Sequence, residues 1–438
     1  MKTPIVIALA MVAAGCGSLT ETSASQILAS NLITPSNAPL LANSVVADFE
    51  CAYADFATAS GIVSDELADA QLSQIGWDYD RRTLTANSPI TDDTCAPISN
   101  NPGSQQVPGV WAPLSTARAD GDNLLGLLNG WTVAQVPTRV KLIGKTAAYT
   151  GYALTLMGET MCAGAIDGGP RITPDSLLGL ADARFSIAIT NATAAHDDSS
   201  LAMAYLGRAR ERLDRGHAAA ARTDAANVPS GFVRVATYDA GSTRRENRLY
   251  TVMFRDYFYS VQSPFWRFMY DTAAATIDTV KNGNTVVAID TVRHGVSDPR
   301  VAVDSSGIKG ADNATIIWQA QKYPTIGTSI SIAHSSEAQL IIAEADLAAG
   351  NTAGAINIID SLHKAVNLPP YTRSTSPDTV RTAIINERAA ELFLEGHRLG
   401  DMIRYKLPLN PPAGTPFKDG GFYGTQLCFP LPVIENGK

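Results

Sequence analysis

The sequence has few of the residue patterns that bind metals, phosphates or nucleic acids. Its six histidines are scattered without HExxH spacing, and its five cysteines form no CxxC pair. The GKT at residues 144–146 lacks the preceding glycine of a phosphate-binding loop. Basic residues cluster only in pairs, and Asp plus Glu outnumber Lys plus Arg by 42 to 34. We therefore expect no metal site, no cofactor and no nucleic-acid partner.

Long apolar runs are also missing, apart from one near the N-terminus. The run from Ile5 to Ala14 follows Lys2 and is too short to span a bilayer as a mature helix. It ends in AAGC, a small-residue cleavage site closed by Cys16. The run resembles a bacterial lipoprotein signal, which implies that residues 1–15 are removed and that Cys16 is acylated. An ordinary secretory signal with an incidental cysteine is the alternative.

The remaining chain has the composition of a globular protein, with 45% hydrophobic and 17% charged residues. Residues 16–44 are rich in Ser, Thr, Asn and Pro and predict a lipidated tether. Ordered structure is expected to begin near Val45. We expect a single domain over residues 45–438, with a distinct C-terminal region at 335–438.

Helical periodicity predicts that this domain is mainly α. Helices are expected within residues 47–71, 110–130, 138–161 and 172–192. Residues 199–229 and 335–370 resemble tetratricopeptide-like helical hairpins, with serines at 199–200 and 335–336 as expected caps. The second hairpin begins with a helix that is apolar on two sides, which is typical of stacked helices. Residues 232–333 predict irregular loops and a few short strands.

Residues 383–405, AIINERAAELFLEGHRLGDMIRY, predict two helices joined by a turn at Gly396. Three glutamates stack on one face of the first helix and repel one another: Glu387, Glu391 and Glu395. The nearest cations in the sequence are Arg388, Arg398 and Arg404. We therefore expect a helix-turn-helix clasp that is held by pairs of Glu and Arg.

This stretch resembles the C-terminal signature of SusD/RagB-like outer-membrane nutrient-binding lipoproteins, and the closing CFPLPVIEN is similar to the end of that family. The residues that match the signature are Glu387, Arg388, Glu391, Leu392, Glu395, Gly396, Arg398, Asp401 and Arg404. The resemblance implies a protein anchored by lipid to the outer membrane, facing the cell surface. It also implies that the chain caps a SusC-like TonB-dependent β-barrel transporter and delivers an oligomeric nutrient to it.

After Cys16 is set aside, four cysteines remain, and these allow three disulfide connectivities. We expect Cys51 to pair with Cys95, because the segment between them is rich in loops, and Cys162 to pair with Cys428. Four reduced and buried thiols are the alternative.

Paired carboxylates raise the possibility of glycoside hydrolysis. Glu387 and Glu391 lie one helical turn apart, but flanking arginines lower carboxyl pKa values, the wrong direction for a general acid. His397 has no nucleophile beside it, so a packing role in the turn is favoured. We therefore predict no catalytic residue and no enzyme activity.

A binding surface remains as the expected function. Sugars are held by aromatic rings with polar groups around them, so aromatic residues on irregular segments are the candidates, although an aromatic residue taken singly belongs more often to the core than to a site. The predicted ligand-binding residues are Trp77, Asp78, Tyr79, Arg81, Trp266, Tyr270 and Trp318. A glycan ligand is favoured over a peptide. The alternative from another class is a structural adaptor lipoprotein of the cell envelope, built of helical repeats, with no small nutrient as ligand.

Overall fold

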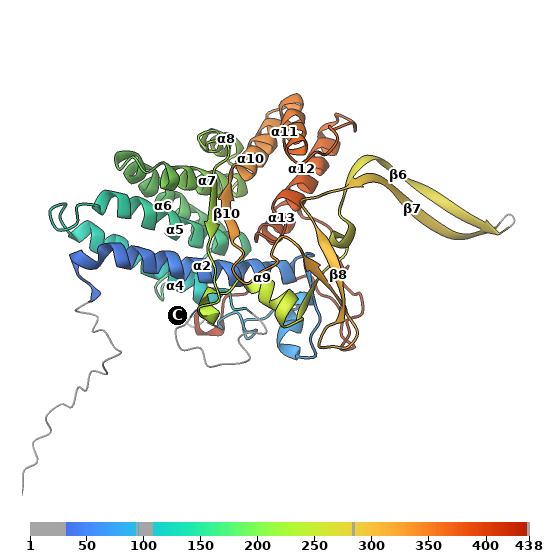
Figure 1. Cartoon of the computed structure of the whole chain (residues 1–438), viewed down its shortest axis with the longest axis horizontal. Coiled ribbons are helices and arrows are strands. Elements are labelled where there is room, and N and C mark those ends of the chain that lie inside the picture. The colour runs from blue at the N-terminus through green and yellow to red at the C-terminus, as the bar shows by residue number, and fades with distance from the viewer. Residues whose placement is uncertain (1–31, 93–94, 96–107, 283–284, 436–438) are drawn as a thin grey trace, which may run out of the picture.

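Antiparallel helices build most of the body, as the sequence predicts (Figure 1). The computed structural model describes residues 32–92, 95, 108–282 and 285–435; Cys16, the signal peptide and the first part of the tether lie outside them. The long helices are α2 (Ala38–Val63), α4 (Trp111–Gly130), α5 (Arg139–Thr160), α6 (Pro174–Ala194), α7 (Asp198–Asp214), α8 (Ala218–Ala225), α10 (Ser335–Ala348), α11 (Thr352–Ala365), α12 (Pro377–Glu391) and α13 (Arg398–Tyr405). Shorter ones are α3 (Trp77–Asp80) and α9 (Arg248–Tyr250).

The helices stack in sequence as a solenoid. Helix α5 packs on α6, α6 on α7 and α7 on α8, and α10 contacts α8, α11 and α12. Helix α10 is therefore enclosed by neighbours, as its two apolar sides predict. Close packing depends on small residues: a Cβ at Gly151 of α5 would lie 2.6 Å from the ring of Phe185 on α6.

Several helix boundaries differ from the sequence-based expectations. Helix α2 begins at Ala38, so the last residues of the predicted tether are helical and ordered structure begins before Val45. It ends at Val63, after which residues 67–69 form a strand. Asp197, and not the serines that follow it, caps α7, and α10 has no side-chain cap. An Asp side chain accepts the same backbone bond as Ser, so the sequence alone does not separate them.

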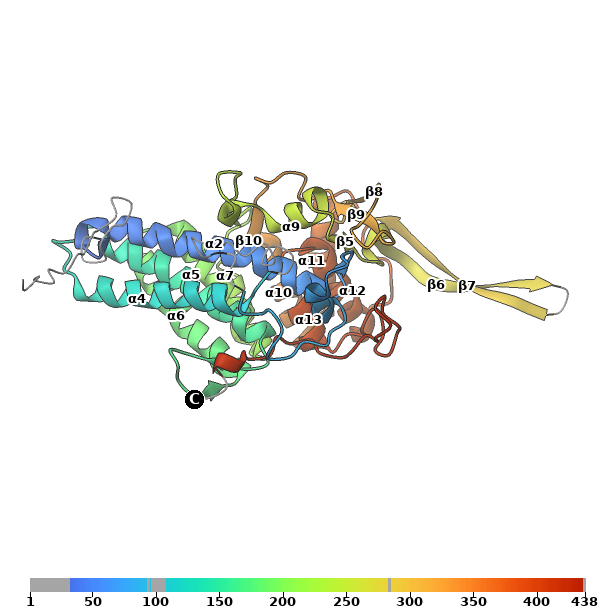
Figure 2. The ribbon, with the colours of Figure 1, turned by 90° about the horizontal axis from the view of Figure 1, so that it is seen from below.

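The strands pair two by two, and every pair is antiparallel. The pairs are β1 (Leu67–Asp69) with β5 (Tyr259–Val261), β2 (Gly164–Ala165) with β3 (Arg171–Ile172), β4 (Val233–Ala236) with β10 (Ile330–His334), β6 (Met269–Asn282) with β7 (Thr285–Ser297), and β8 (Val303–Lys309) with β9 (Ile316–Ala320). The β6–β7 hairpin projects from the body in both ribbon views, as Figure 2 shows from below. The mainly helical fold with short strands is confirmed.

Two disulfides tie the chain together. Cys51 bonds to Cys95, and Cys162 bonds to Cys428, which matches the predicted pairing. The second bond fixes the C-terminal segment, which has little regular structure, to the end of α5. Across the described ranges, none of the helices combines the length and apolar composition that a bilayer crossing requires.

Candidate functional site

The signature stretch folds as a helix, a tight turn and a second helix. Helix α12 ends at Glu391, and the turn holds Leu394 at φ 55° and Gly396 at φ 80° before α13 begins. Glu395 therefore lies in the turn and not on the face of a continuous helix. A Cβ at Gly396 would approach the buried ring of Phe56 to 2.8 Å, so this position requires glycine for both its backbone angle and its packing.

The three signature glutamates receive their cations from outside the stretch, which corrects the predicted pairing. Arg300 contacts Glu387 at 2.8 Å and Glu391 at 3.2 Å through one nitrogen. The other oxygen of Glu387 lies 2.7 Å from His363. These cations are distant in sequence, so residue spacing within the signature could not identify them.

Glu395 is held by two further cations. Lys322 lies 2.8 Å from one of its oxygens and His334 lies 3.0 Å from the other. Burial acts to raise the pKa of Glu395, but the charges of Lys322 and His334 outweigh it and lower the pKa to about 2. Glu395 is thus a permanent anion, unsuited to act as a general acid.

The signature arginines bind other carboxylates. Arg388 binds Asp401 at 2.8 Å, and Arg398 binds Asp65 through two bonds of 2.7 and 2.8 Å. Arg404 binds Glu344 of α10 at 2.5 Å. Arg388 therefore holds the two signature helices together through an aspartate and not a glutamate, while Arg398 joins the signature to the segment after α2 and Arg404 joins it to α10.

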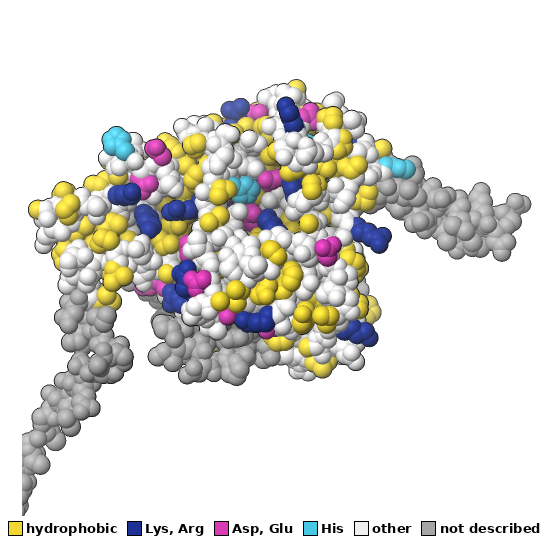
Figure 3. Space-filling model, in the orientation of Figure 1, with side chains coloured by type: hydrophobic (Ala, Val, Ile, Leu, Met, Phe, Trp, Pro, Cys, Tyr) yellow, Lys and Arg dark blue, Asp and Glu magenta, His cyan; other side chains and the backbone are white. Residues whose placement is uncertain are grey.

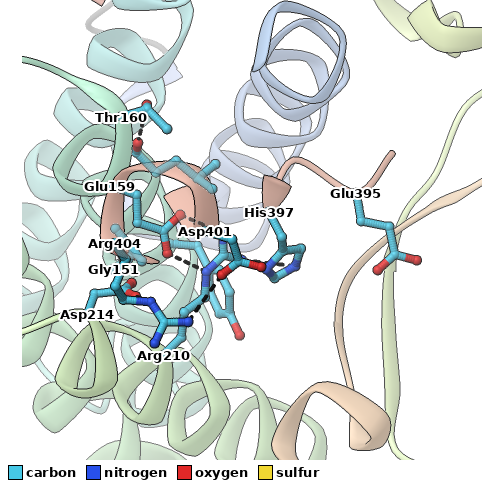
Figure 4. Close-up of polar contacts among 12 residues, drawn as sticks. Gly151, Glu159, Thr160, Arg210, Asp214, Glu395, His397, Asp401 and Arg404 are labelled. Atoms are coloured by element: carbon cyan, nitrogen blue, oxygen red, sulfur yellow. Dashed lines mark hydrogen bonds and ion pairs between the residues drawn. The ribbon is translucent and has the colours of Figure 1, made fainter. Parts of the chain in front are cut away.

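A buried ionic cluster lies behind the turn (Figure 4). Arg210 of α7 binds Glu159 of α5 with bonds of 2.5 and 2.6 Å, and it lies 3.3 Å from the ring of His397. Burial and the nearby charge of Arg210 hold the pKa of His397 well below its usual range. His397 is therefore a neutral, buried group of the turn.

Two of the predicted aromatic residues meet at the surface. The rings of Trp266 and Trp318 stack with their centroids 4.9 Å apart and their planes 13° from parallel. Trp266 is 40% exposed, although exposed tryptophan surface is costly in water. We call this pair the tryptophan platform. Trp318 is half-buried against the core, so the exposed ring of the pair is that of Trp266, and an exposed indole ring suits the apolar face of a sugar.

Backbone bonds and buried rings hold the platform in place. Trp266 donates its indole N–H to the carbonyl of Val261, and the backbone N–H of Trp318 donates to the hydroxyl of Ser260 at 2.9 Å. Beneath it, Phe265 stacks on Phe393 of the signature turn at 5.1 Å. The signature therefore supports the platform from inside the protein without being part of its surface.

A polar cleft that the sequence did not predict lies beside the signature turn. Its volume is about 550 Å³, and its charged lining residues are Arg300, Lys322, His334, Glu391 and Glu395. Figure 3 shows basic, acidic and histidine side chains gathered at the centre of the visible face, over the region between β10 and α12 of Figure 1. The segments that form the cleft are far apart in sequence, so no local pattern reveals it.

Solved structures share this fold. It is similar to a SusD superfamily protein from Bacteroides vulgatus (TM-score 0.63, 13% identity, covering 92% of this chain and 96% of that one). It is also similar to a SusD-like protein from Bacteroides fragilis (TM-score 0.66, 14% identity, 91% and 94% covered). A SusD-like carbohydrate binding protein from B. vulgatus gives a TM-score of 0.59 at 13% identity, with 92% and 96% covered. No curated protein sequence matches this chain.

Residues 332–421 match the SusD family. The matched segment contains the whole signature, and the rest of the chain shares the fold of the SusD-like structures. The resemblance to the SusD/RagB-like family is therefore confirmed.

Two other residues proposed for ligand binding lie in the core of the protein. Tyr79 is fully buried with its ring 5.9 Å from that of Phe429. Tyr270 is 7% exposed and packs against His363 at 4.1 Å. The expectation that they face a ligand is not met, because both rings are enclosed by protein. Sequence alone did not distinguish packing aromatics from exposed ones.

The remaining predicted residues form a separate group near the C-terminal segment. Trp77 packs edge-on against Phe417 at 6.0 Å, and Asp78 binds Arg81 at 2.9 Å. Arg81 also pairs with Asp419. These side chains are partly exposed, but their charged groups form ion pairs with one another. The structure thus separates the predicted residues into the tryptophan platform, this group and two core tyrosines.

Proposed function

We propose that this chain is a non-catalytic lipoprotein of the outer membrane that binds an oligomeric glycan and passes it to a SusC-type TonB-dependent transporter. The observation that carries the proposal is the tryptophan platform, in which the exposed ring of Trp266 stacks on the half-buried ring of Trp318. The similarity to a SusD-like carbohydrate binding protein supports a glycan as the ligand over a peptide. Lipidation at Cys16, within the anchor sequence AAGC, would place the platform at the membrane surface.

The absence of a suitable acid and base in the signature supports a binding role. Both oxygens of Glu387 are occupied, by Arg300 and His363, and Glu395 is held as an anion. A hydrolase needs one carboxyl group with a raised pKa facing a cleft. We therefore expect bound glycans to be recovered unchanged.

The experiment is isothermal titration of the full chain, purified in detergent, with a panel of oligosaccharides. Trp318→Ala and Trp266→Ala should each weaken binding at least about fivefold, since loss of an aromatic stacking surface costs on the order of 1 kcal/mol or more. Trp131→Ala is the matched control, because Trp131 lies in the turn after α4, outside the platform. Its binding should equal that of the unaltered chain.

Two outcomes would favour the adaptor function instead. One is that no oligosaccharide binds. The other is that the chain co-purifies from outer membranes with envelope proteins but with no large TonB-dependent barrel. Chromatography of the titrated sugar tests the absence of hydrolysis, because shortened products would reveal an enzyme.

A further inference from the structure

The polar cleft beside the signature turn has a positive end. Lys322 uses two of its three donors, one to Glu395 and one to the carbonyl of Phe393 at 3.0 Å. His334 binds the same carboxylate at 3.0 Å. Burial acts to lower the pKa of His334, but the charge of Glu395 outweighs it and raises the pKa. Two cationic groups therefore share a single carboxylate at this end.

The cleft also contains an acceptor. Arg300 uses four of its five N–H donors on Asp298, Glu387 and Glu391. Glu391 contacts Arg300 through one oxygen only, and its side chain is 17% exposed. Within the described part of the chain, its second oxygen has no hydrogen-bond donor. A ligand hydroxyl can donate to it without displacing a protein group.

The floor of the cleft is open and of mixed character. Ser336, in the first turn of α10, lines it together with apolar residues such as Phe232 and Val233. The cavity volume of about 550 Å³ lies in the range of small-molecule sites. The cleft thus offers two cationic groups, an anionic acceptor and room for a small ring.

We propose that this cleft binds a sugar acid, with the ligand carboxylate at Lys322 and His334 and the sugar hydroxyls donating to Glu391. A ligand carboxylate supplies the second anion that the two cationic groups lack, and a neutral sugar does not. The proposal rests on the proposed function, because it names the class of glycan that the protein takes. The cleft and the tryptophan platform are distinct sites, joined along the chain by β9 and the residues that follow it.

The test compares two monosaccharides, D-galacturonate and D-galactose, which differ only at C6. Isothermal titration of the full chain in detergent should show at least about tenfold tighter binding of galacturonate, the value of one good charge-assisted hydrogen bond. The methyl ester of galacturonate, which is neutral at C6, should bind like galactose. This comparison requires no variant. Equal affinities for galacturonate and its ester would overturn the proposal.

Variants locate the binding site. Lys322→Met should reduce the preference for galacturonate to less than about threefold, because the carboxylate loses its ammonium partner. Lys418→Met is the matched control: Lys418 is also ion-paired and is 27% exposed, against 26% for Lys322, but it contacts Asp69 and Asp312 outside the cleft. A preference that survives Lys322→Met, or that is lost equally in Lys418→Met, would contradict the assignment.

Two further results distinguish sugar-acid binding in the cleft from oligosaccharide binding at the tryptophan platform. Trp318→Ala should leave galacturonate binding unchanged even where oligosaccharide binding is lost. If oligosaccharides fail to bind while galacturonate still does, the proposed function fails and the cleft site stands. If L-alanine binds more tightly than galacturonate, the cleft recognises amino acids and the sugar-acid assignment is wrong.

Discussion

Glu66 is a buried acid in the segment that follows α2. One of its oxygens accepts the backbone N–H of Leu394 in the signature turn at 2.8 Å, and the other has no donor among the described residues. Burial raises the pKa of Glu66 to about 8, although Leu394 and Arg398 act to lower it. The folded protein therefore keeps a proton on Glu66 at neutral pH.

This proton makes stability depend on pH. An unfolded chain releases the proton near pH 4.3, so between about pH 4 and pH 8 the folded state holds more protons and loses stability as the pH rises. Glu66→Gln removes this titration and keeps an acceptor for Leu394. The free energy of unfolding of Glu66→Gln, measured by urea denaturation, should exceed that of the unaltered chain by more at pH 9 than at pH 5. The excess should grow by about 2 to 4 kcal/mol between the two pH values.

Asp378→Asn is the control for this effect, since Asp378 has a side chain that is 93% exposed on α12. Its pH dependence should follow that of the unaltered chain. A difference between Glu66→Gln and the unaltered chain that stays constant from pH 5 to pH 9 would show that Glu66 is ionised in the fold.

At the scale of elements, the turn between α12 and α13 is the most constrained feature of the signature. Gly396 has a left-handed backbone and lies against Phe56 of α2. Gly396→Ala should lower the free energy of unfolding by about 2 to 4 kcal/mol, because it adds backbone strain and a clash in a packed core. Urea denaturation measures this change.

Gly350 provides the comparison within the same fold. It has φ 83° in the turn after α10, but nothing lies within 4 Å of a Cβ at that position. Gly350→Ala should therefore cost only the backbone strain, about 1 kcal/mol. Equal effects at the two glycines would mean that the contact with Phe56 contributes nothing.

The sequence predicts the helices better than it predicts the tertiary contacts between side chains. The helical spacing of α5 and α6 is a local signal, and it placed these helices correctly. Gly396 correctly indicated a left-handed turn, but α12 already ends at Glu391, before the expected helix end. The cations of the signature glutamates were missed, because Arg300 and Lys322 reach them from another part of the chain. Burial of Tyr79 and Tyr270 likewise depends on tertiary packing, which the sequence of a loop does not encode by itself.

At the scale of the whole molecule, the two disulfides close loops of very different length. The Cys162–Cys428 bond spans 266 residues and the Cys51–Cys95 bond spans 44. In the loop-entropy account the longer loop stabilises the fold more, by roughly 1.6 kcal/mol. Replacing Cys162 and Cys428 together by Ala should therefore lower the thermal midpoint more than replacing Cys51 and Cys95.

Limited proteolysis gives an independent measurement of the same change. The segment after Tyr405 has little regular structure and should be cleaved faster once Cys428 is replaced. The Cys51/Cys95 double variant should leave this segment protected. Equal cleavage in the two double variants would show that packing, and not the disulfide, holds the C-terminal segment.

The Cys162–Cys428 bond also sets an order of events during biogenesis. Cys162 lies 266 positions before Cys428, so the bond can close only after Cys428 has been synthesised and both cysteines have reached an oxidising environment. The separation of 44 positions between Cys51 and Cys95 imposes a much shorter delay. Under the proposed export, an oxidase that acts on the emerging chain meets Cys51 and Cys95 first, and Cys162 stays unpaired until Cys428 has emerged.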